Sequence, residues 1–202
     1  MNTQLGPLLE KYGECLRADL FRHGGGRGVR AQLWQIFLGE GGRYSFWMRS
    51  CAFLKQSALL KYTVFPIAKW QYRRACIDFG VWIPYSTKID AGFHIAHAAC
   101  IFINEHSEIG RNCTISQGVT LGFKPGPNGG APILGEEVYV GPGAKIIGPV
   151  HVGNRVVVGA NAVVTKDFPD DVIVAGVPAE AIGIAGNVEY IAFRYRFDCQ
   201  NV

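Results

Sequence analysis

The stretch LGEEVYVGPGAKIIGPVHVGNRVVVGANAVV, residues 134–164, repeats an apolar residue at every sixth position. The repeated residues are Leu134, Val140, Ile146, Val152, Val158 and Val164. A period of six matches neither the 3.6 of an α-helix nor the 2 of a β-strand. It is typical of a β-helix, in which each hexapeptide supplies one short strand and one turn, and three hexapeptides make one triangular coil.

The same repeat extends toward the N-terminus with one slip and one interruption. It occupies Ile83, Ile89 and Ile95, slips by two residues, and resumes at Ile103, Ile109, Ile115 and Leu121. The Gly/Pro-rich loop FKPGPNGGAP, residues 123–132, then precedes Leu134. We expect the repeated residues to point inward, and the glycines that often follow them, such as Gly141, to serve the corners. A β-sandwich, the alternative fold, would show a period of 2 and irregular spacing.

The composition fits one folded domain, or one domain with a small appendage. Of 202 residues, 49% are hydrophobic and 18% charged, which excludes a disordered chain. Glycine is abundant at 26 residues, but the sequence has no G-X-Y period, so collagen is excluded.

The sequence contains no apolar run of about 20 residues, so we expect no membrane-spanning helix. The six cysteines form no CxxC pair and no secretory signal opens the sequence, so we expect free thiols and a cytoplasmic protein.

Charge divides the chain near residue 80. Residues 1–80 hold 12 Lys/Arg against 5 Asp/Glu, whereas residues 81–202 hold 8 against 11. We expect an N-terminal helical region at 1–80, a β-helix at 81–183 and a C-terminal tail at 184–202. The helical region is basic and aromatic, which leaves two interpretations open: a cap that packs on the coils and helps trimerisation, or a face for an anionic membrane surface. No nucleic-acid-binding motif appears.

Three stretches resemble the left-handed β-helix acyltransferases: AHAACIFINEHSEIGRNCTISQGVTLG, VYVGPGAKIIGPVHVGNRVVVGANAVVTKDFPDD and VIVAGVPAEAIG. Within them the chain is similar to the serine acetyltransferase-like branch, and most of all to the O-acetyltransferases of capsule and exopolysaccharide synthesis. The resemblance implies a left-handed parallel β-helix, a homotrimer, and acetyl-CoA as the acetyl donor, with no metal.

The family's general base is a histidine, and His97 in AHAACIFIN occupies its place. An imidazole suits this task because a hydroxyl needs help to lose its proton near neutral pH. The acetyl group would then pass directly to the acceptor, without an acyl-enzyme on the nearby Cys100. His94 and His106 are candidate substrate contacts. The spacing of the three histidines does not match the zinc site of the γ-type carbonic anhydrases, which share the β-helix.

The sequence departs from serine acetyltransferases at the positions that hold the amino acid. Trp82 replaces the Asp that orients the base, Ala96 replaces the Asp before it, and Gly130-Ala131 replaces an Arg-His pair. These losses favour a neutral sugar, so we expect a saccharide O-acetyltransferase of polysaccharide biosynthesis, at the inner face of the cytoplasmic membrane. A serine O-acetyltransferase, N-acetylation of an amino sugar, and a non-catalytic scaffold are the alternatives.

The resemblance also implies contacts for both substrates. The CoA arm would follow the small corner residues Gly141, Pro142, Gly159 and Ala160, with Lys145 and Lys166 at its phosphates. Asn104 or Glu105 would orient His97 or contact the acceptor. Phe123, Lys124 and Asn128 of the loop would lie over the acceptor site, which in this family is often that of a neighbouring subunit.

Overall fold

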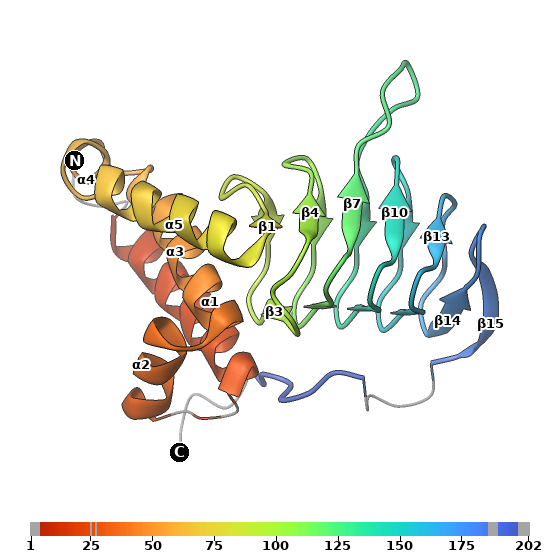
Figure 1. Ribbon diagram of the computed structural model, residues 1–202, viewed down its shortest axis with the longest axis horizontal. Coiled ribbons are helices and arrows are strands. Elements are labelled where there is room, and N and C mark those ends of the chain that lie inside the picture. The colour runs from red at the N-terminus through yellow and green to blue at the C-terminus, as the bar shows by residue number, and fades with distance from the viewer. Residues whose placement is uncertain (1–4, 25, 27, 186–189, 198–202) are drawn as a thin grey trace.

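The computed structural model describes residues 5–24, 26, 28–185 and 190–197. A group of helices stands at one end of a tapering stack of coils (Figure 1). The helices are α1 (Leu5–Gly24), α2 (Val29–Phe37), α3 (Glu40–Leu54), α4 (Ala58–Thr63) and α5 (Phe65–Phe79). Gly80, at φ 62°, ends α5 in the left-handed conformation that glycine adopts most readily, and the first coil begins at the next residue.

The coils form three parallel sheets. Sheet A holds β1 (Val81–Trp82), β4 (Ile101–Ile103), β7 (Thr120–Gly122), β10 (Lys145–Ile147) and β13 (Val163–Val164), five strands that lie side by side in Figure 1. Sheet B holds β2 (Lys88–Ile89), β5 (Glu108–Ile109), β8 (Ile133–Leu134) and β11 (His151–Val152). Sheet C holds β3 (His94–Ile95), β6 (Thr114–Ile115), β9 (Tyr139–Val140), β12 (Val157–Val158), β14 (Val172–Ala175) and the antiparallel β15 (Glu180–Ile184).

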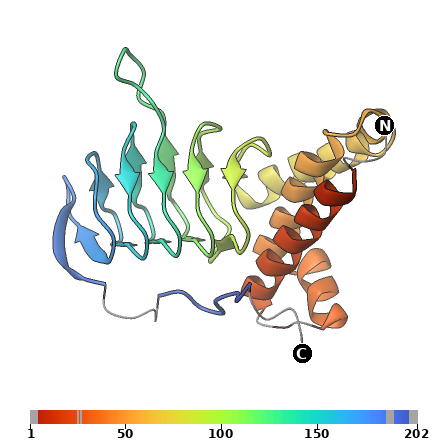
Figure 2. The same cartoon turned by 180° about the vertical axis from the view of Figure 1, so that it is seen from behind.

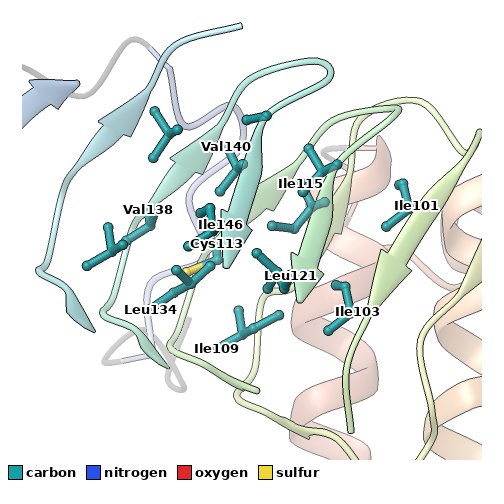
Figure 3. Close-up of a cluster of buried hydrophobic side chains, with 14 of the residues drawn as sticks. Ile101, Ile103, Ile109, Cys113, Ile115, Leu121, Leu134, Val138, Val140 and Ile146 are labelled. Carbon is teal, nitrogen blue, oxygen red and sulfur yellow. The ribbon is translucent and has the colours of Figure 1, made fainter. Parts of the chain in front are cut away.

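The six-residue repeat builds the core of this solenoid. All its positions are buried, and each stacks on its equivalent in the next coil, as Ile95 does on Ile115 and Ile115 on Val140. Figure 3 shows these side chains filling the space between the sheets, with Cys113 and Val138 among them. The expected left-handed β-helix with an N-terminal helical region is confirmed.

The slip in the repeat is a longer corner. Ile95 pairs with Ile115 and Ile103 with Leu121, so the step from sheet C to sheet A takes eight residues in the first coil and six in the second. The two additional residues lie in the corner 96–100, which leads from sheet C to sheet A. Cys100 takes a positive φ of 53° there. His97 lies on this corner.

A buried ion pair fixes the helices to the first coil. Asp19 of α1 accepts hydrogen bonds from the N–H groups of Gly92 (2.9 Å) and Phe93 (2.8 Å). The same carboxylate pairs with Arg49 of α3 at 2.9 Å, and Arg49 also donates to the carbonyl of Ile89. Asp19 is fully buried and the Arg49 side chain is only 11% exposed. The pair therefore sets how α1 and α3 sit on the coils.

The C-terminal segment 190–197 returns along the coils to the helices (Figure 2). Arg22 of α1 donates to the carbonyl of Ala192 at 3.1 Å, and also to those of Gly92 and Cys113. Burial lowers the pKa of Arg22 to about 10. Asn112 and Tyr195 exchange two hydrogen bonds, of 3.0 and 3.2 Å. The segment thus packs on sheet C of its own chain; the rest of the predicted tail, at 186–189 and 198–202, lies outside the described residues.

Candidate functional site

His97 lies on the edge of the solenoid where sheet C turns into sheet A. Gln117, Pro142 and Ala160 lie on the same edge, one in each following coil. Backbone bonds hold these corners in line: the N–H of Gly143 donates to Gln117 O at 2.8 Å, and the N–H of Asn161 to Pro142 O at 2.8 Å. Adjacent strands are about 4.8 Å apart, so His97 is roughly 10 Å from Pro142 along this edge.

The predicted CoA glycines therefore share an edge with the predicted base. A Cβ on Gly141 would lie 2.8 Å from Val158 O and 2.9 Å from Ala160 N. The corner packing alone thus requires glycine here, whether or not a ligand approaches. The small residues leave the edge without side chains that would shield its backbone groups.

A cavity of about 190 Å³ opens beside His97, between the helices and the first coil. Ala96 and Ala98, which flank His97 in the chain, both line it. The remaining lining residues come mainly from the helices: His23, Trp34, Gln35, Glu40, Gly41, His94 and Ile95. Glu40 is the single carboxylate among them. The cavity therefore contains a negative charge from α3 and reaches the two neighbours of His97 in the chain.

Gly41 lets α3 approach the coil closely enough to close this cavity. A Cβ there would lie 2.4 Å from the His23 ring and 2.9 Å from Ile95 O. His23 is fixed at both ring nitrogens: Nδ1 is 2.7 Å from Asp19 O, and Nε2 accepts the Ile95 N–H at 3.2 Å. This pairing makes Nδ1 the protonated nitrogen of a neutral ring.

His94 faces His23 at 4.9 Å between ring centroids. Its Nδ1 is shielded from solvent and has no hydrogen-bond partner among the described residues. Burial first, and then the charges of His23, Arg22 and His97, lower the pKa of His94 to about 2. Burial also lowers the pKa of His23. Both rings are thus neutral walls of the cavity near pH 7, and His94 is a poor proton carrier there.

These two histidines predict a loss of stability in mild acid. Their folded-state pKa values lie below the unfolded value of about 6.5, so below that pH the unfolded chain binds more protons and gains relative stability. Each histidine should cost up to about 1.4 kcal/mol per pH unit below 6.5. We expect urea unfolding at pH 5.5 to show a lower midpoint than at pH 7.5. His94→Gln should reduce the difference, whereas His151→Gln, on an exposed position of β11, should not.

Most other predicted site residues lie on the opposite edge of sheet A. Asn104, Glu105 and His106 form the corner from β4 to β5, and His106 approaches the Phe123 ring at 6.0 Å. A groove of about 340 Å³ on the outer face of sheet A includes Trp82, Asn104 and Phe123. Within one protomer neither Asn104 nor Glu105 shares a corner with His97.

The loop 123–132 and the predicted CoA lysines, Lys145 and Lys166, do not all lie on the same edge of sheet A. Lys124 pairs with Gly130 in a small hairpin that projects after β7, and Asn128 is exposed on it (Figure 1). Lys145 donates to Gly118 O, on the edge that holds His97. Lys166 instead pairs with Glu180 at 2.6 Å. The structure therefore brings only Lys145 to the candidate CoA edge.

The histidines do not gather around a metal position. Among the described residues, no group of three or more His, Cys, Asp or Glu side chains could hold a metal ion. Over the same part of the chain, no helix is both long and apolar enough to cross a membrane.

The comparisons with known proteins find similarity to hexapeptide-repeat transferases and, among these, to serine acetyltransferases. The family model for bacterial transferase hexapeptide (six repeats) matches residues 131–166. A serine acetyltransferase of Mycobacterium tuberculosis is 43% identical over 54% of this chain and 51% of its own length. One of Helicobacter pylori is 40% identical over 62% of this chain and 74% of its own length. The chain belongs to the serine acetyltransferase family.

Solved structures of serine acetyltransferases extend the match to the helices. The enzyme of Brucella abortus aligns with a TM-score of 0.71 at 27% identity, over 90% of this chain and 74% of that one. A serine acetyltransferase in complex with CoA aligns with a TM-score of 0.67 at 29% identity, over 89% and 73%. The chain nevertheless spans only about half the length of the first curated relatives that it matches, which are 51% and 44% covered.

The expected capsule-type saccharide acetyltransferase is wrong, and with it the saccharide acceptor and the role in polysaccharide biosynthesis. The relatives described above are serine acetyltransferases. The prediction treated the loss of charge at Trp82, Ala96 and Ala131 as the loss of an amino-acid site. It missed Glu40, because a carboxylate some 57 positions from His97 in sequence gives no local signal until the helices pack on the coil.

Proposed function

We propose that the protein is an acetyl-CoA-dependent O-acetyltransferase that acts on serine. The observation that supports this best is the position of His97, on an exposed corner between the cavity with Glu40 and the small-residue edge of Pro142 and Ala160. An acceptor in the cavity and a thioester brought along the edge would meet at this imidazole.

The reaction needs one proton carrier. His97 takes the proton of the acceptor hydroxyl as its oxygen attacks the thioester carbonyl of acetyl-CoA. The tetrahedral intermediate collapses, the C–S bond breaks, and the proton returns from His97 to the CoA sulfur. The products are O-acetylserine and CoA, so no covalent enzyme intermediate is required. Backbone N–H groups along the edge are the available donors for the oxyanion.

We propose a homotrimer for the active form. In one protomer the loop 123–132 and the corner of His97 lie on opposite edges of sheet A. A neighbouring copy would bring its own loop, with Phe123 and Lys124, to the corner of His97. The CoA arm would then run between two solenoids, beside Gly159 and Ala160.

Glu40 is proposed to bind the ammonium group of serine. It lines the cavity beside His97, is exposed to solvent, and has no ion-pair partner among the described residues. Glu40→Gln should lower kcat/KM for L-serine about 10-fold, mainly through KM, because a charge-assisted contact is lost. Glu10→Gln, an exposed change on α1, should leave both constants unchanged.

The assay follows CoA release with L-serine, with L-serine methyl ester and with 3-hydroxypropionate, which lacks the amine. We expect the natural protein to use L-serine and to reject 3-hydroxypropionate, and Glu40→Gln to narrow that difference. No CoA release with L-serine or its ester, in a protein that still binds acetyl-CoA, would contradict the serine proposal. Equal turnover of L-serine and 3-hydroxypropionate would contradict the role of Glu40 alone.

A further inference from the structure

Helices α4 and α5, with Val64 between them, expose several large apolar side chains at the end of the molecule away from β15 (Figures 1 and 2). Tyr62 is 78% exposed and Leu59 74%. The other exposed members of this face are Val64, Ile67, Trp70 and Ile77. We call these six residues, with the cations among them, the α4–α5 face.

The helical period places this face opposite the core. Along α5, Ile67, Trp70 and Ile77 follow one another at spacings of three and seven, which keeps them on one side of the helix. Ala68 and Ala75, which are buried, lie on the other side, against the rest of the protein. The exposed stripe is therefore a second apolar side of α5, beyond the one that the fold uses.

The charge on this face is mostly positive. Residues 41–79, to the end of α5, contain seven Lys/Arg and one acidic residue, Asp78. Five of these cations are exposed and have no carboxylate partner among the described residues: Lys55, Lys61, Lys69, Arg73 and Arg74. The other two, Arg43 and Arg49, pair with Asp78 and Asp19. The face thus combines uncompensated positive charge with exposed aromatic rings.

Cations and rings lie against one another within the face. Arg74 stands over the Trp70 ring at 5.2 Å, and Lys61 over the Tyr62 ring at 5.6 Å. In a lipid bilayer the aromatic ring of such a pair can insert between the headgroups and the acyl chains. The neighbouring cation can then contact a lipid phosphate. Exposure of these aromatic rings to water is unfavourable, so a partner that covers them would stabilise the face.

We propose that the α4–α5 face docks the protein on an anionic lipid bilayer. The charge argues for this partner over a second copy of the chain, because two such faces would oppose five unpaired cations to five, and the one acid of α5, Asp78, is already paired with Arg43. An anionic membrane instead offers negative headgroups to the cations of the α4–α5 face and an apolar layer to its aromatic and aliphatic side chains. The proposal concerns this face alone and does not depend on the acetyl transfer reaction.

Vesicle co-sedimentation tests the proposal with the full chain. We expect binding to vesicles of phosphatidylcholine with about one third phosphatidylglycerol, and little to vesicles of phosphatidylcholine alone. Raising the salt from about 50 to 300 mM should weaken the binding, since the attraction acts within a Debye length. Equal binding to both lipids, or none to the anionic vesicles, would overturn the proposal.

Matched variants separate charge from apolar contact. Lys61→Gln with Lys69→Gln should weaken binding roughly 25-fold, at about fivefold for each cation. Lys88→Gln with Lys166→Gln removes the same charge from the coils and should leave binding within about twofold. Trp70→Ala should also weaken binding, with unchanged circular dichroism. If Trp70→Ala instead dissociates an oligomer in light scattering and leaves vesicle binding intact, the face is a contact between copies and the proposal fails.

Discussion

Replacing His97 with alanine is expected to lower the rate of acetyl transfer to L-serine by about 10²–10⁴-fold. The alanine cannot accept the hydroxyl proton, and at neutral pH the neutral hydroxyl attacks the thioester poorly. The exposed corner of His97 holds no buried packing, so the variant should remain folded. Steady-state CoA release measures the rate, and calorimetric titration with CoA should show unchanged affinity.

His151→Ala is the control for this variant. His151 faces solvent on β11 of sheet B, away from the edge of His97, and its removal should leave the rate unchanged. A His97→Ala protein that retained a rate within about threefold of the natural one would remove the general base from the mechanism. If the natural protein neither binds CoA nor releases it, the chain is a scaffold on the same fold.

Replacing Asp19 with asparagine is expected to destabilise the fold by about 3–5 kcal/mol. The change leaves Arg49 in place, almost excluded from solvent and without its carboxylate. It also weakens the acceptor of the Gly92 and Phe93 N–H groups. Urea unfolding at a fixed protein concentration measures the effect, since assembly contributes to apparent stability.

Asp78→Asn is the matched control, because Asp78 pairs with Arg43 at 2.7 Å on the surface, where the two side chains are 40% and 32% exposed. An exposed pair contributes at most about 1 kcal/mol. Equal losses for the two variants would show that the buried pair does not hold the helices on the coil.

The sequence predicted the solenoid because its signal is local and repeated. One hexapeptide alone is weak evidence, but Leu134 and its twelve equivalents agree in period, and all thirteen are buried in the core. The helices were less defined, because the sequence indicated a helical region at 1–80 but not where each helix begins and ends. The packing of α1 on the coil depends on Asp19 and Arg49, which lie thirty residues apart in an unremarkable pattern.

The sequence predicted only those residues of the candidate site that lie within one contiguous motif or repeat. The motif around His97 indicated the candidate base, and the family resemblance indicated the corner residues Pro142 and Ala160 as candidate CoA contacts. His94 appeared as a second candidate from its nearness in sequence, but strand alternation turns it under the helices, toward His23. Glu40 and the cavity arise from contacts between distant segments, which no spacing in the sequence reveals.

The return of residues 190–197 along the coils changes how the solenoid can come apart. In a stack of repeats each coil touches only its neighbours, so the last coil can fray while the first stays folded. Here Ala192 and Tyr195, which follow the last coil in the chain, bind Arg22 and Asn112 beside the first two. Opening either end therefore releases contacts at the other, and the array melts as one cooperative unit instead of coil by coil.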